Sequence, residues 1–129
     1  MCGFRPAAEI SAFCTNVPEL RMVVGGEACD KLAAAVAAGS PDDALRAHIR
    51  GCFEGLMTRD NATVSAQLAS LVARLGKAGG ELTPLEVLLL RLDKEFPGGD
   101  VGCFCVYFLN VINLAPGEAM FLGPNEPHA

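Results

Sequence analysis

The segment TPLE at residues 83–86 is the strongest constraint on how this chain folds, because it defines the start of a helix. Thr83 can accept a hydrogen bond from the backbone of Glu86, Glu86 can return one to Thr83, and proline suits the first helical turn. Leucines at positions 85, 88, 89 and 92, with Phe96, then recur at the spacing of one helix face. The pattern predicts an amphipathic helix with a buried leucine face, ended by the PGG at residues 97–99.

Similar helical patterns fill most of the chain before this segment. Helices are expected over about residues 6–17, 27–38, 40–56 and 60–75, and Asp100 is placed to cap a final one. Ser40 is the expected cap of the third segment, with Pro41 at its first helical position. The side chains expected to form the core are Phe13, Ile49, Phe53, Leu68, Leu71, Leu88, Leu89 and Leu92.

The pattern changes after residue 108. Residues 109–114 and 119–122 fit extended structure better than a helix, and Pro116-Gly117 between them is typical of a turn. The predicted fold class is therefore mainly α, with five or six short helices followed by a β-hairpin. A lone two-stranded hairpin is only marginally stable, so further strands are expected to complete it.

Composition excludes several classes of partner. The 129 residues suffice for one domain, and the net charge is −5, with ten lysines and arginines scattered along the chain. Nucleic-acid binding needs clustered positive charge, so it is not expected. The sequence contains no run of about 18 apolar residues, so no membrane span is predicted. The first ten residues lack the pattern of a signal peptide, and a cytoplasmic location is the expectation.

The six cysteines show no CxxC pair and no framework spacing. Cytoplasmic thiols stay reduced, so Cys2, Cys14, Cys29, Cys52, Cys103 and Cys105 are expected to be buried free thiols. Metal binding and redox use are the alternatives to this structural interpretation.

The two histidines differ in their surroundings. His48 stands four residues before Cys52, a spacing that offers two ligands on one helix face, but without a second pair it is typical of an ordinary helix residue. His128 follows Pro124 and Pro127, which restrict the backbone and fix the direction of its ring. From the residues alone, a ligand role and an incidental position both remain open for His128.

Two carboxylates lie near the His128 loop. Glu118, in PGE, is expected to be a turn residue. Glu126 is expected either to support His128 or to be exposed.

Three blocks of sequence carry a resemblance to a known family: CGFRPAAEISAFCTNVPEL, LTPLEVLLLRLDKEFPGGDVGCFCVYFLN and LAPGEAMFLGPNEPHA. In this order they resemble type I mannose-6-phosphate isomerases, also called phosphomannose isomerases, over residues 2–129. The resemblance implies a zinc-dependent cupin enzyme with an inserted helical domain. Residues 1–108 would be that inserted domain. Residues 109–129 would be the first strands and the metal-ligand loop of an incomplete cupin (jelly-roll) barrel, with His128 as a zinc ligand.

The resemblance also implies an activity and its limits. The family interconverts mannose 6-phosphate and fructose 6-phosphate, in mannose and GDP-mannose precursor metabolism. Its Gln-x-His pair, its glutamate ligand and its basic residues lie outside this chain, so we expect an internal fragment that is inactive alone. A non-catalytic helical interaction module and a sugar-binding cupin-derived protein are the alternative readings.

Overall fold

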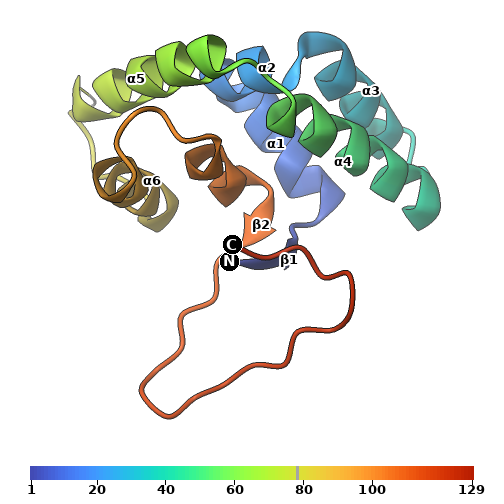
Figure 1. Ribbon diagram of the computed structural model, residues 1–129. Helices are drawn as coiled ribbons and strands as arrows, with labels where there is room; N and C mark the ends of the chain where they lie inside the picture. The colour runs from blue at the N-terminus through green and yellow to red at the C-terminus, as the bar shows by residue number, and fades with distance from the viewer. Residues whose placement is uncertain (78) are drawn as a thin grey trace.

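A computed structural model describes residues 1–77 and 79–129, and helices dominate it (Figure 1). In chain order the elements are β1 (Cys2–Phe4), α1 (Ala7–Asn16), α2 (Pro18–Val24), α3 (Gly26–Ala37), α4 (Asp42–Met57), α5 (Asn61–Lys77), α6 (Pro84–Glu95), the 3-10 helix η1 (Val101–Tyr107) and β2 (Leu109–Asn110). The mainly helical class is therefore confirmed, and so is a two-stranded antiparallel pairing.

Polar side chains cap the N-termini of α5, α6 and η1, where the sequence contains strong capping signals. The Glu86 backbone N–H donates to the Thr83 hydroxyl at 3.3 Å, and the Thr83 backbone N–H donates to the Glu86 carboxylate at 2.7 Å. Asp60 accepts from the Thr63 backbone N–H at 2.8 Å just before α5, and Asp100 caps η1. These local contacts satisfy helix N–H groups that have no partner inside the helix.

The expected cap at Ser40 is wrong. Helix α4 begins at Asp42 with Pro41 before it, and no side chain caps its first turn. Ser40 instead completes the end of α3, where its backbone N–H donates to the Ala35 carbonyl oxygen at 3.0 Å. Gly39, with φ 63°, allows this left-handed end, and the Ser40 backbone is therefore already used by the preceding helix.

Helix α2 was not expected from the sequence. Pro18 ends the first helical segment as predicted, but it is also the first residue of α2, where a missing N–H has no consequence. The seven residues of α2 contribute Leu20, Val23 and Val24 to the core.

The core lies between the helices and η1. Ile49, Leu68, Leu71 and Leu89 are buried as expected, whereas Phe13, Phe53, Leu88 and Leu92 are only partly buried and pack against the core. The largest fully buried side chains include two that the sequence did not single out, Phe104 and Phe108. Both follow from the 3-10 helix, which turns the CFCVYF run into the centre of the molecule.

One ion pair joins α2 to α5 from within the packed region. Both oxygens of the buried Glu19 carboxylate accept from the Arg74 guanidinium, at 2.9 and 2.7 Å. The Arg74 side chain is 47% exposed, so water reaches one side of the pair. The guanidinium holds the pKa of Glu19 below its usual range.

Replacing Glu19 with glutamine should lower the free energy of unfolding near neutral pH by about 1–2 kcal/mol, a modest value because water screens half-exposed Arg74. A lowered pKa means that the pair stabilises the fold above the pKa of unfolded Glu19, and that this stabilisation is lost as the pH falls through the folded-state pKa. Urea unfolding of both chains should therefore show a difference that disappears in acid. Glu9→Gln is the control, because the Glu9 carboxylate, which pairs with Arg5, is far more exposed than that of Glu19. A Glu19→Gln deficit that persists undiminished in acid would contradict the assignment.

The β-hairpin expected between residues 109–114 and 119–122 does not form in the structure. Strand β2 pairs with β1 at the other end of the chain, and residues 111–122 contain one turn, at Pro116-Gly117, but no strand. The predicted strand over residues 119–122 is therefore wrong for the structure described. Residues 111–127 project from the helices as a long loop that returns to β1 (Figure 1). Its apolar side chains Ile112, Leu114, Met120 and Phe121 are exposed.

Among the helices of the described residues, none has the length and apolar character that crossing a membrane requires.

Candidate metal-ligand loop

His128 lies beside β1, on the edge opposite to β2. Cys2 and His128 form an antiparallel bridge. The Gly3 backbone N–H donates to the Pro127 carbonyl oxygen at 2.9 Å, and the Ala129 backbone N–H donates to the Met1 carbonyl oxygen at 3.1 Å. Main-chain hydrogen bonds on both sides of His128 therefore fix the backbone from which its side chain projects.

The His128 ring is exposed and makes one polar contact. Its Nδ1 lies 3.0 Å from the carbonyl oxygen of Glu126. A carbonyl oxygen only accepts, so this contact places a hydrogen on Nδ1 and leaves the Nε2 lone pair free. A hydrogen bond from one ring nitrogen to a carbonyl is the usual arrangement of a histidine that binds a metal through the other nitrogen.

The loop before His128 is shaped by backbone geometry. Asn125 has φ 62°, in the left-handed region, and it turns the chain between Pro124 and Glu126. Glu118 lies apart from His128 in the sequence and acts as a turn residue, as expected: its carboxylate accepts from the Ala115 backbone N–H at 2.8 Å. Glu126 approaches His128 through its backbone carbonyl, and its carboxylate lies against Gly3.

His128 is not joined by other potential metal ligands within the described residues. Across residues 1–77 and 79–129, no three His, Cys, Asp or Glu side chains are arranged to hold a metal ion. His48 is half-buried on α4, and the thiol of Cys52 donates to the Ala28 carbonyl oxygen at 3.4 Å. The interpretation of the His48–Cys52 pair as ordinary helix residues stays a prediction.

The cysteines are structural in their surroundings. All six are free, and all except half-buried Cys2 are buried. Burial raises the pKa of the Cys103 and Cys105 thiols to about 11. Interaction with Cys29 and Cys52 raises the pKa of Cys14 above its usual range. Buried thiols with a raised pKa, such as those of Cys103 and Cys105, are poor nucleophiles and poor metal ligands, which supports their role as small core residues. Cys29 differs from them, because hydrogen bonding with Cys14 and Cys52 lowers its pKa to about 4.

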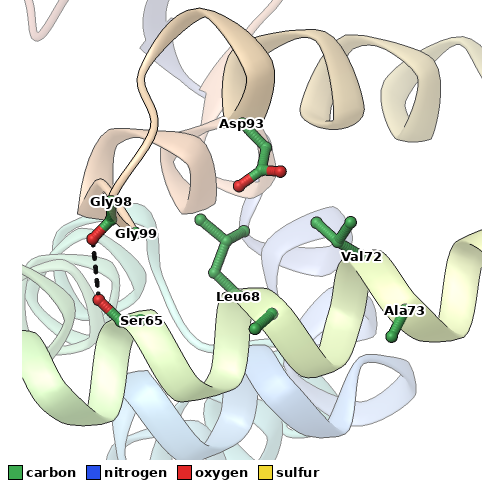
Figure 2. Close-up of a pocket in the computed structure, with 8 residues that line it drawn as sticks. Ser65, Leu68, Val72, Ala73, Asp93, Gly98 and Gly99 are labelled. Atoms are coloured by element: carbon green, nitrogen blue, oxygen red, sulfur yellow. Dashed lines mark hydrogen bonds between the residues drawn. The ribbon is translucent and has the colours of Figure 1, made fainter.

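Figure 2 shows a pocket that is lined by α5, by Asp93 of α6 and by the loop that follows α6. Its walls include Leu68 and Val72, and its polar groups are Asp93 and Ser65, whose hydroxyl donates to the Gly98 carbonyl oxygen at 3.0 Å. Recognition of a sugar phosphate needs convergent hydrogen-bond donors and positive charge, and this pocket supplies neither. We therefore do not assign it as the sugar site.

Comparison with known proteins identifies the family to which the chain belongs. A sequence model for the helical insertion domain of type I phosphomannose isomerase matches residues 23–109, which run from α2 to β2. The chain belongs to this family of helical insertion domains.

Curated relatives match over the whole chain. It is 42% identical to mannose-6-phosphate isomerase of Bos taurus and 41% identical to that of Homo sapiens, in each case covering 31% of the relative. It is 34% identical to mannose-6-phosphate isomerase 1 of Arabidopsis thaliana and covers 30% of it. The chain thus spans about a third of the length of these relatives.

Proposed function

We propose that this chain is the helical insertion domain and the metal-ligand loop of a zinc-dependent isomerase that interconverts mannose 6-phosphate and fructose 6-phosphate. The observation that carries the proposal is full-length alignment of the chain with mannose-6-phosphate isomerases at 41–42% identity. The reaction would belong to mannose and GDP-mannose precursor metabolism in the cytoplasm.

His128 is the residue that this chain would contribute to the zinc site. Its Nδ1 contacts Glu126, so the opposite ring nitrogen, Nε2, keeps a free lone pair that can coordinate zinc. Bound zinc would polarise the sugar oxygens during aldose–ketose isomerisation. The chain's own part is to hold one neutral imidazole in a fixed orientation, while the helices support the β1 strand against which His128 lies.

The remaining groups would come from the part of the protein outside this chain. A catalytic zinc site uses about three protein ligands and an open position for water or substrate. The substrate phosphate requires cationic groups, and proton transfer between neighbouring sugar carbons requires a base. We propose that sequence flanking residues 1–129 supplies these groups and the other strands of a cupin barrel.

The test compares the two histidines in the full-length protein. His128→Ala should abolish isomerase activity in a coupled assay and remove zinc after dialysis, because a ligand is lost, while circular dichroism stays helical. His48→Ala is the matched control and should keep both zinc and activity. Full zinc content and activity in His128→Ala would overturn the proposal.

The 129-residue chain provides the complementary measurement. A single exposed imidazole cannot fix a coordination geometry, so we expect neither turnover of mannose 6-phosphate nor zinc retained after dialysis. Stoichiometric zinc in the dialysed chain would mean that residues other than His128 form the site.

A further inference from the structure

A β-bulge at Gly3 separates the two edges of β1. On the β2 side, Cys2 pairs with Asn110 and Phe4 with Leu109, so Gly3 is one extra residue in β1. Gly3 has φ 68°, the left-handed conformation that glycine adopts without steric cost at this kind of bulge. Bulges redirect the backbone groups of a strand, and they are enriched beside functional sites.

The Asn110 side chain replaces the regular ladder at this bulge. Its amide nitrogen donates to the Gly3 carbonyl oxygen at 3.2 Å and to the Phe4 carbonyl oxygen at 3.0 Å. The Gly3 N–H lies on the opposite edge, where it donates to the Pro127 carbonyl oxygen at 2.9 Å. One side chain on β2 thus holds the two peptide groups that directly follow the N–H in contact with the His128 segment.

The same glycine lies against Glu126. A Cβ at Gly3 would overlap the Glu126 carboxylate, which can move aside as the end of a flexible side chain, but the φ of 68° would strain an alanine at this position in any case. The carbonyl of Glu126 is the group that the His128 Nδ1 contacts. A continuous series of contacts therefore runs from Asn110 through Gly3 to Pro127 and Glu126, and from there to the imidazole.

This unit is anchored to the helices. The Phe4 ring packs edge-on against Phe53 of α4, with 5.3 Å between ring centroids, and the Arg5 backbone N–H donates to the Phe108 carbonyl oxygen at 2.8 Å. The termini of the chain meet at this sheet, directly below the helices in Figure 1. The helical domain therefore supplies a rigid base for the strand that carries the bulge.

We propose that the Gly3 bulge and the Asn110 amide are positioning elements that fix the ring orientation of His128 and direct its Nε2 toward the metal. This inference rests on the proposed role of His128 as a zinc ligand. Neither Gly3 nor Asn110 touches the metal or the sugar; both act through the backbone of residues 126–128. Loss of such supporting contacts around a ligand commonly lowers metal affinity by about 10–100-fold.

The first measurement determines which ring nitrogen of His128 carries the hydrogen, in the absence of metal. The 129-residue chain has only two histidines, so nitrogen-15 NMR can resolve both rings at about pH 8.5, where an ordinary imidazole is neutral. Free neutral imidazoles favour the hydrogen on Nε2, whereas the contact with Glu126 favours Nδ1. We expect Nδ1-protonated His128 in the unsubstituted chain and a shift toward the Nε2-protonated form in Asn110→Ala.

Three variants control this measurement. Gly3→Ala should produce the same shift through a different contact, so the inference can be tested even if one variant folds poorly. Asn110→Gln, which keeps the amide, should restore part of the signal. Asn113→Ala, an exposed asparagine in the following loop, should leave the His128 ring unchanged, and His48 should be unchanged in every variant that keeps the helical circular dichroism.

The second measurement uses the full-length protein. Asn110→Ala should lower zinc affinity by about 10–100-fold in competition with a chelator, whereas Asn113→Ala should not. Unchanged His128 ring shifts in folded Asn110→Ala and Gly3→Ala would overturn the positioning role alone. Zinc held at full level by His128→Ala would overturn the ligand role on which it rests, so the two failures are distinguishable.

Discussion

Leu89→Ala should lower the free energy of unfolding of this chain by about 2–5 kcal/mol. Leu89 is 0% exposed and is the only fully buried side chain of α6 in the described structure. Helix α6 contacts η1, whose Phe104 is also fully buried. Removal of the isopropyl group beyond Cβ would leave a cavity that these packed neighbours fill only in part.

Val87→Ala is the matched control on the same helix. Val87 is 54% exposed, so its truncation should change the free energy of unfolding by less than about 0.5 kcal/mol. Urea unfolding followed by circular dichroism measures both variants under one condition. If Leu89→Ala were no more destabilised than Val87→Ala, α6 would not bury the face that the structure assigns to it.

The leucine face of α6 shows what local patterns predict well. A capping box and four leucines at helical spacing lie within a dozen residues, and each feature depends only on near neighbours in the chain. The start of α5 directly after Asp60 is predictable for the same reason. Ser40 shows the limit, because a serine before a proline can serve the end of one helix as well as the start of the next.

The sheet depends on contacts that no local pattern contains. Strand β1 has three residues, and its partner Asn110 lies more than a hundred residues later. The apolar run at residues 119–122 resembles a strand, but a strand needs a pairing partner, and none is present for it in the described structure. Periodicity detects an amphipathic segment and cannot identify what it pairs with.

The candidate site divides in the same way. His128 is found through its resemblance to a family, and its proline-braced loop is visible in the sequence. Gly3 and Asn110 were not singled out, because their role arises only when β1 lies between β2 and the His128 segment. An isolated glycine between Cys2 and Phe4 is a weak indication of a bulge, and it has meaning only once the strand has been identified.

Gly55→Ala should destabilise the chain by about 1–3 kcal/mol, although alanine is the better helix former. Gly55 lies on α4, where the end of α2 crosses it, and a Cβ there would overlap the carbonyl oxygen of Val24. That oxygen belongs to the backbone, so it cannot rotate away as a side chain would. Arg59 holds the same end of α2 by donating from Nε to the Val23 carbonyl oxygen at 2.8 Å.

Gly51, one turn earlier on α4, supplies the matched control. Nothing lies within 4 Å of a Cβ added at Gly51, so Gly51→Ala should instead stabilise the chain by about 0.5–1 kcal/mol through helix propensity. The two substitutions are chemically identical and lie in the same helix. Opposite changes in the free energy of unfolding would therefore be due to the close approach of α2 to Gly55. Urea unfolding of the pair decides between the two effects. Stabilisation by both substitutions would show that the Val24 carbonyl does not rest on α4.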